Sequence, residues 1–197
     1  MYGIPNMKLP KWIIERRVNL MRESGIEFNC GVDACACADA IAAESDAVVI
    51  ATGANVARDV ALPGRELSGI HFALEYLSEV TSAYLDERDC AISAEGKDVV
   101  VIGGGDTGND CVACALRQGV ANVTQVIRAQ RAPETCDAQA VWPAERVVFS
   151  QGYGQREASE RFGEDPRIFS TDTIAFSGGE GAEAGSVAHV HVQDVSY

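Results

Sequence analysis

Short apolar runs separated by charged residues and glycines predict alternating helices and strands in the first part of the chain. Residues 10–25 carry a rough apolar stripe at helical spacing, with a proline at the start and a glycine at the end. The alternation over residues 26–30 predicts a short strand, whereas the alanine-rich stretch 34–45 is ambiguous. The apolar run 46–53 ends in a small-residue turn and predicts a strand buried on both faces.

The most informative pattern lies in the middle of the chain. A helix is predicted over residues 70–85, after a connecting segment rich in glycine. An apolar strand over 99–102 then leads into a glycine-rich turn at 103–108. A helix over 109–118 and a second strand over 123–127 complete a strand–turn–helix–strand unit.

Beyond Arg128 the pattern predicts a helix over 155–162 and strands over 168–176 and 187–195. A hairpin-like turn at 178–185 separates the two strands. The order of elements predicts an α/β protein with a Rossmann-like fold. It would hold a central parallel sheet and a small antiparallel excursion near the C-terminus.

The turn carries a glycine fingerprint, Gly103-x-Gly105-x-x-Gly108, directly after a strand and at the start of a helix. The first glycine permits a tight turn, the second lets the backbone approach a pyrophosphate, and the third lets helix and strand pack closely. The helix N-terminus offers free N–H groups and a positive dipole end to phosphates. We therefore expect this unit to bind a dinucleotide; the alternative is a turn whose glycines have only a structural role.

Arginine, and no acidic residue, follows the second strand. NAD sites usually place Asp or Glu there to hold the ribose 2′-hydroxyl. Arg128 is positioned to pair with a 2′-phosphate, which predicts NADP(H), and Arg131 is a second candidate. The alternative for Arg128 is a solvated surface arginine.

Composition narrows the class of partner. With 47% hydrophobic and 23% charged residues, the chain is typical of a globular protein. Its formal net charge of −13 disfavours nucleic acid and anionic membranes. No apolar run is long enough for a membrane span and the N-terminus lacks a secretory pattern, so we expect a cytoplasmic protein with no membrane partner. Its seven cysteines are then expected to be reduced thiols.

Other candidate groups have structural explanations of equal or greater weight. Asp106 could act on the nicotinamide side of a cofactor, or it could cap the following helix. Cys111 and Cys114 could form a redox or metal pair, but burial as small hydrophobic residues is favoured. No cysteine spacing matches a zinc site, so we expect no metal.

Several segments together resemble the small (beta) subunit of NADPH-dependent glutamate synthase. The resemblance covers nearly the whole chain and its motifs are specific, among them the glycine turn and the Leu-Pro-Gly-Arg-Glu-Leu-Ser-Gly-Ile-His-Phe-Ala segment. The segments that carry it are 1–9, 15–20, 51–54, 62–73, 101–111, 115–119, 133–135 and 162–167.

The resemblance implies a flavoprotein oxidoreductase for glutamate biosynthesis. In that family NADPH passes a hydride to FAD, and electrons leave through iron–sulfur clusters to a large (alpha) subunit. By position, the resemblance implies that the turn cradles the NADPH pyrophosphate and that Arg128 holds the 2′-phosphate. It places Lys8, Thr52 and Gly53 on the flavin side. The turn residues concerned are Gly103, Gly104, Gly105, Asp106, Thr107 and Gly108.

The sequence also departs from the family pattern. A cluster domain and an FAD fingerprint would precede residue 1, and a further flavin motif would follow residue 197. We therefore expect an internal fragment, inactive alone. Residues 1–57 would be a partial flavin-domain segment, 58–95 a connection with a helix, and 96–197 the NADPH-binding domain. Cys136 replaces the basic residue usual after Pro-Glu-Thr.

Two alternatives remain open at this point. The chain could be part of a ferredoxin:NADP bifurcating oxidoreductase or of a dihydropyrimidine-dehydrogenase-like reductase. It could instead be a non-catalytic dinucleotide-binding or redox-sensing domain, because one fold hosts many functions. In either case, unpaired sheet edges could lead to a homo-oligomer.

Overall fold

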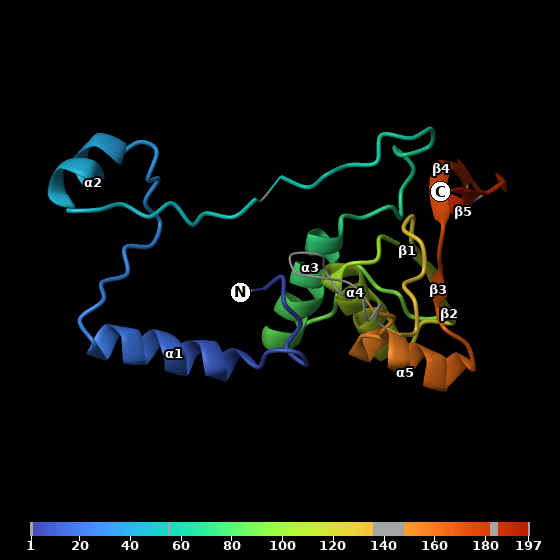
Figure 1. The fold of residues 1–197 in the computed structure, drawn as a ribbon, viewed down its shortest axis with the longest axis horizontal. Helices are drawn as coiled ribbons and strands as arrows, with labels where there is room; N and C mark the ends of the chain where they lie inside the picture. The colour runs from blue at the N-terminus through green and yellow to red at the C-terminus, as the bar shows by residue number, and fades with distance from the viewer. Residues whose placement is uncertain (1, 55, 136–147, 182–184, 197) are drawn as a thin grey trace. The chain divides into compact units, whose positions relative to one another are not determined.

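The computed structural model describes residues 2–54, 56–135, 148–181 and 185–196, and it divides the chain into two compact units (Figure 1). One unit comprises Leu9–Arg58. The other comprises Met1–Lys8 together with Asp59–Tyr197. The domain boundaries expected from the sequence, 1–57, 58–95 and 96–197, stay a prediction.

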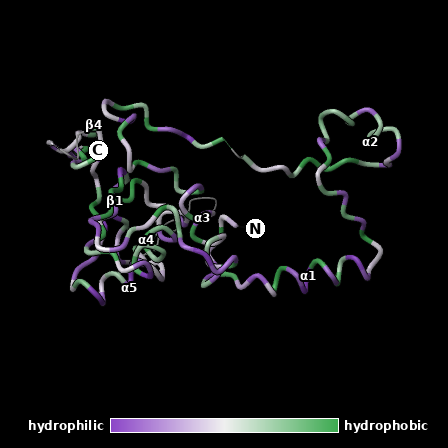
Figure 2. Tube along the Cα trace, turned by 180° about the vertical axis from the view of Figure 1, so that it is seen from behind, coloured by the Kyte–Doolittle hydropathy of each residue, from purple (hydrophilic) through white to green (hydrophobic). Residues whose placement is uncertain are grey.

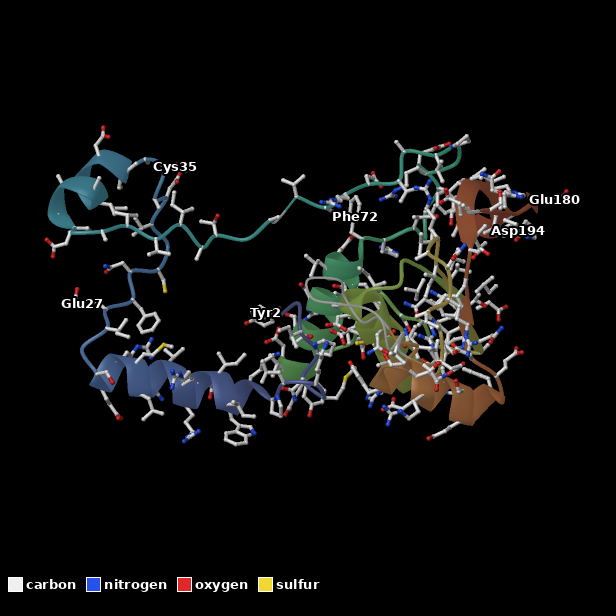
Figure 3. All side chains as sticks on the ribbon, viewed as in Figure 1. Tyr2, Glu27, Cys35, Phe72, Glu180 and Asp194 are labelled. Carbon is white, nitrogen blue, oxygen red and sulfur yellow. The ribbon has the colours of Figure 1, made fainter. Side chains whose placement is uncertain are left out.

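The unit Leu9–Arg58 contains two helices, α1 (Lys11–Glu23) and α2 (Ala38–Glu44). The first confirms the prediction for residues 10–25: Pro10 precedes it, and Gly25 has a φ of +88° just after its end. Hydrophilic and hydrophobic residues alternate along α1 (Figure 2). The side chains of this unit stand out along the chain, among them the exposed Cys35 (Figure 3).

The strands predicted at 26–30 and 46–53 are wrong for this chain, because neither segment forms a strand. A strand needs a neighbour to satisfy its backbone N–H and C=O groups, and the described part of this unit contains none. Val49 and Ile50 are accordingly 87% and 84% exposed. Apolar side chains favour burial, but the described residues of this unit do not bury Val49 and Ile50.

The second unit contains a parallel three-stranded sheet, in the order β1-β2-β3, which confirms the predicted fold class. Its strands are β1 (Asp98–Ile102), β2 (Asn122–Val126) and the short β3 (Arg167–Ile168). The register pairs Asp98 with Asn122 and Ile102 with Val126. The sheet packs with helices α3 (Ala73–Leu85), α4 (Asp106–Gln118) and α5 (Tyr153–Phe162).

An antiparallel pair, β4 (Thr171–Gly178) and β5 (Val187–Asp194), confirms the predicted excursion near the C-terminus. The single strand predicted over 168–176 is wrong, however. Ser170 has a φ of +52°, which breaks the segment into β3 and β4. A left-handed residue interrupts the regular extended backbone, so the two parts join different sheets.

Helix α4 is the most deeply buried element of the second unit. Its residues Asn109 to Ala115 are all buried. On one side Val112 and Ala115 pack with β2 and α5 residues, and on the other Cys111 and Cys114 pack with Leu77 of α3. This packing fixes the start of α4, and with it the glycine turn, relative to the sheet.

Candidate functional site: the glycine turn at the start of α4

The glycine turn joins the end of β1 to α4 within three residues. Gly103 has a φ of +118°, which favours glycine, and its N–H donates to the carbonyl oxygen of Val126 at 2.9 Å. Gly105 is the N-cap and α4 begins at Asp106, three residues earlier than predicted. The earlier start follows from the backbone: Gly105 is extended, and its carbonyl accepts the N–H of Asn109 at 3.1 Å.

The space around each glycine differs. A Cβ on Gly105 would meet no atom within 4 Å, so the approach to this backbone is open. On Gly104 it would lie 3.0–3.1 Å from the Ile127 side chain. On Gly108 it would lie 2.6 Å from the carbonyl oxygen of Gly103 and 2.8 Å from Nε2 of Gln125. Gly108 is therefore needed for packing, whereas Gly105 leaves room for a group from outside the chain.

The exposed start of α4 has the features of an anion site. Gly103 to Thr107 are exposed, and the first amides of a helix have no intrahelical acceptor. Their N–H groups and the helix dipole attract negative charge. The N-cap position belongs to Gly105 and Asp106 is the first residue of α4, so Asp106 is not the N-cap residue of this helix, and the suggested capping role is wrong.

Arg128 follows the carboxyl end of β2, as predicted, and its side chain is 72% exposed. Its Nε lies 3.4 Å from a carboxylate oxygen of Asp172 on β4. Charge pairing at such an exposure is weak, so a phosphate could compete for the guanidinium. The geometry therefore leaves Arg128 able to interact with an anion at the same edge of the sheet.

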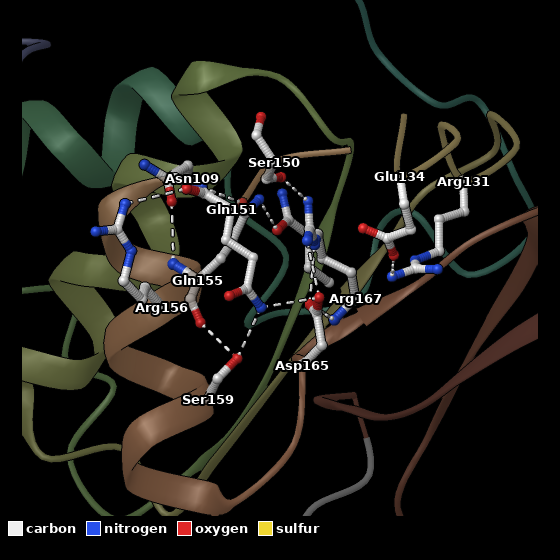
Figure 4. A network of polar contacts seen from close by, with 12 residues as sticks. Asn109, Arg131, Glu134, Ser150, Gln151, Gln155, Arg156, Ser159, Asp165 and Arg167 are labelled. Atoms are coloured by element: carbon white, nitrogen blue, oxygen red, sulfur yellow. Dashed lines mark hydrogen bonds and ion pairs between the residues drawn. The ribbon is translucent and has the colours of Figure 1, made fainter. Parts of the chain in front are cut away.

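Arg131 contacts both a carboxylate and an aromatic ring. Its Nη2 donates to Glu134 at 2.5 Å (Figure 4). Its guanidinium lies 3.8 Å from the ring centroid of Phe149. Arg167 approaches the same ring at 4.6 Å. Because a cation over an aromatic face is attracted by the ring, these contacts hold Arg131 and Arg167 against Phe149.

Arg167 is anchored in turn by Asp165, whose carboxylate it contacts at 2.8 Å while its side chain is only 7% exposed. Burial acts to raise the pKa of Asp165, but hydrogen bonds from Arg167 and Gln151 outweigh it, and the net effect lowers that pKa. The guanidinium also donates to the carbonyl oxygen of Ser150 at 2.8 Å, so this pair holds the backbone just before α5.

Lys8, expected on the flavin side, binds α4. Its Nζ donates to both carboxylate oxygens of Asp110, at 2.9 and 3.1 Å. The hydroxyl of Tyr153 on α5 donates to the same carboxylate at 2.8 Å. Burial and this hydrogen bond raise the pKa of Tyr153. The two donors together compensate the burial of Asp110, and the flavin-side role of Lys8 stays a prediction.

Cys111 and Cys114 are buried, which confirms the structural reading of this pair. Burial raises the pKa of each thiol to about 12, with a smaller contribution from neighbouring charges. Thiols with such pKa values carry almost no thiolate at neutral pH, and the thiolate is the reactive form. The pair therefore has the character of core residues.

Thr52 and Gly53 are exposed and lie outside any strand. Gly53 has a φ of +68°, so the predicted turn geometry is present although the strand before it is not. Their role towards a flavin stays a prediction. Cys136 lies outside the described residues.

Sequence reasoning missed three amides beneath the turn: Asn109, Gln125 and Gln155. Gln125 donates from Nε2 to the carbonyl oxygen of Gly103 at 2.7 Å. The signal was present, since a glutamine inside the apolar stretch Val123–Ile127 needs a buried partner.

Among the described residues, no group of three or more His, Cys, Asp and Glu side chains is arranged to hold a metal ion. The same part of the chain has no helix that is both long and apolar enough to cross a bilayer.

Comparison with known proteins identifies relatives. Residues 13–152 match the family described as pyridine nucleotide-disulphide oxidoreductase. The chain is 45% identical to the glutamate synthase (NADPH) small chain of Bacillus subtilis, over 87% of this chain and 36% of that protein. It is 37% identical to the Mycobacterium tuberculosis small chain, over 95% and 39%. It is also 39% identical to the glutamate synthase (NADH) of Schizosaccharomyces pombe, over 98% and 9%.

These matches confirm the resemblance expected from the sequence. The chain spans little more than a third of the length of the two small chains. Among solved structures, it is similar to Mycobacterium tuberculosis FprA in complex with NADPH. That match has a TM-score of 0.45 and 16% identity, over 80% of this chain and 49% of that one.

Proposed function

The chain belongs to the pyridine nucleotide-disulphide oxidoreductase family, and from this premise we propose that its glycine turn binds the pyrophosphate of NADP(H). The observation that carries the proposal is the open backbone at Gly105, placed beside the exposed N-terminus of α4. A pyrophosphate needs close backbone approach and N–H donors, and the turn offers both. The bound cofactor would supply the hydride chemistry, while the chain binds and orients it.

The parent reaction we propose is that of a glutamate-synthase-like flavoprotein. The names of the relatives support it: two of those described above are glutamate synthase (NADPH) small chains. In the longer protein, hydride would pass to FAD and electrons onward through iron–sulfur clusters. Because this chain spans only part of those relatives, we expect it to bind the nucleotide without turnover.

The residues present fit NADP(H) better than they fit FAD. The turn combines an open backbone with the exposed N-terminus of a helix, whereas Thr52 and Gly53 are exposed in irregular backbone that begins no helix. FAD and the clusters are therefore assigned to the longer protein, where Lys8, Thr52 and Gly53 would lie on the flavin side.

The large (alpha) subunit of glutamate synthase is the partner we propose for the parent protein, in the cytoplasm. The name "small chain" carried by the relatives supports a larger partner. Self-association is a further proposal for this chain. In its parallel sheet β1 is an edge strand, and Val100 and Ile102 on it are 40% and 41% exposed.

Arg128 is the residue we propose to select NADP(H) over NAD(H). Its position after β2 and its 72% exposure support contact with a 2′-phosphate, with Arg131 as a neighbouring contributor. The relatives do not decide the question, since their names include both NADPH and NADH.

Calorimetric titration of the chain with NADP+ and NAD+ tests the proposal. Wild type should bind NADP+ more tightly. Arg128→Ala should weaken NADP+ about tenfold or more, the value of one charge-assisted hydrogen bond, and change NAD+ less than twofold. Arg88→Ala is the matched control, because Arg88, just after α3, is also an exposed arginine and forms an ion pair with Glu79 of that helix.

The control should leave both affinities unchanged. Equal affinity of wild type for the two nucleotides would contradict the proposal that Arg128 selects NADP(H) over NAD(H). Binding of neither nucleotide would contradict the proposed site itself.

A further inference from the structure

Three buried amide side chains, from three different elements, form a chain of hydrogen bonds that ends on the glycine turn. Gln125 of β2 is fully buried, and Asn109 of α4 and Gln155 of α5 are 6% and 4% exposed. Asn109 Oδ1 accepts the backbone N–H of Gln155 at 3.1 Å (Figure 4). Nε2 of Gln155 donates to Oε1 of Gln125 at 2.9 Å. Nε2 of Gln125 then donates to the carbonyl oxygen of Gly103 at 2.7 Å.

Backbone groups at both ends fix the direction of this chain. Oε1 of Gln155 accepts the N–H of Gly152 at 2.8 Å, which turns its Nε2 towards Gln125. Gln125 must then offer its oxygen to Gln155 and its NH₂ group to Gly103. Rotating either amide by 180° would oppose two donors or two acceptors in a buried site, which is unfavourable.

The bond from Gln125 controls a group on the exposed side of the turn. A trans peptide unit is planar, and its C=O and N–H point in opposite directions. Because the carbonyl of Gly103 points inwards to Gln125, the N–H of Gly104 points away from the buried amides. The N–H of Gly103 is held separately by Val126, so both peptide units flanking Gly103 are fixed.

Gly108 has a place in the same arrangement. A Cβ there would lie 2.8 Å from Nε2 of Gln125 and 2.6 Å from the Gly103 oxygen. The third glycine of the fingerprint therefore makes room for the amide that reaches the first.

We propose that Gln125, held by Gln155 and Asn109, is a positioning residue that orients the Gly104 N–H towards a bound pyrophosphate. This inference rests on the proposed dinucleotide function. It adds that side chains of β2 and α5, and not only the glycine residues, determine the direction of the N–H donor in the turn.

The test compares two probes that differ in the pyrophosphate. NADP+ contains one, and adenosine 2′-monophosphate does not. Gln125→Met keeps the side-chain length but cannot donate to Gly103. It should weaken NADP+ about tenfold or more, the effect of one lost hydrogen bond to a charged group, and alter adenosine 2′-monophosphate less than twofold.

Gln118→Met is the matched control. Gln118, at the other end of α4, also uses its amide fully: it accepts from Tyr76 and Ala94 and donates to Ile92. Its loss should lower stability and leave the ratio of the two affinities unchanged. Thermal unfolding checks that each variant folds. If Gln125→Met does not fold, Gln125→Asn replaces it, since one methylene fewer removes the reach to Gly103.

The outcomes are distinct. Selective loss of NADP+ binding supports the positioning role. If the Gln125 variant binds NADP+ normally, or loses both probes equally, the positioning role is wrong while the dinucleotide site stands. If wild type binds neither probe, the proposed function is wrong and the inference is wrong with it.

Discussion

Gly108 and Gly105 belong to one fingerprint, but each position requires glycine for a different physical reason. Gly108 lies against the carbonyl oxygen of Gly103 and the amide of Gln125, and both neighbours are fixed by hydrogen bonds. Gly105 faces open space and keeps an ordinary negative φ of −77°. Gly108 therefore contributes to stability, and Gly105 leaves room for a ligand.

Replacement of Gly108 by valine should lower the free energy of unfolding by about 2 kcal/mol or more, because the added methyl groups overpack a site bounded by backbone. Urea denaturation measures this difference. The matched variant Gly105→Ala meets no neighbour and should cost about 1 kcal/mol or less, through a poorer N-cap. Equal stabilities for Gly108→Val and wild type would contradict the packing described here.

At the scale of elements, the strand–turn–helix–strand unit could be predicted because its signals are local. The apolar runs, the glycine spacing and Gly119, with a φ of +85° after α4, each determine backbone within a few residues. The strand at 46–53 could not be settled in this way, since a strand depends on a neighbour. The role of Gln125 was missed for the same reason: its partners come from elements distant in sequence.

Helix α4 also yields a prediction about cysteine reactivity. Cys111 and Cys114 are buried, with pKa values raised to about 12, whereas the cysteines of the other unit are exposed. Because alkylation proceeds through the thiolate, iodoacetamide at pH 7.5 should modify the exposed set rapidly and the α4 pair only after unfolding. The exposed set is Cys30, Cys35 and Cys37.

Mass spectrometry of peptides from native and urea-unfolded samples measures this pattern, with the unfolded sample as the control for intrinsic reactivity. Rapid native modification of Cys111 or Cys114 would mean that the contact between α3 and α4 opens readily. It would contradict their assignment to the core.

In the whole molecule, the two units differ in whether their apolar residues are buried within the unit and in whether they contain the proposed site. Every residue of the proposed pyrophosphate site, and every amide beneath it, belongs to the unit that contains Asp59–Tyr197. The unit Leu9–Arg58 has helices but leaves Val49 and Ile50 exposed among its described residues. Nucleotide binding should therefore depend only on the unit that contains Asp59–Tyr197.

Binding of the NADP(H) pyrophosphate against Gly105 is tested by the affinity of Gly105→Ala for NADP+, measured by calorimetry beside wild type. Alanine at this position meets no atom of the chain within 4 Å, so the fold is retained while its methyl group occupies the approach to the backbone. We expect wild type to bind NADP+ and the variant to lose at least about tenfold in affinity. Unchanged affinity in a folded Gly105→Ala protein would show that the nucleotide does not lie against this turn.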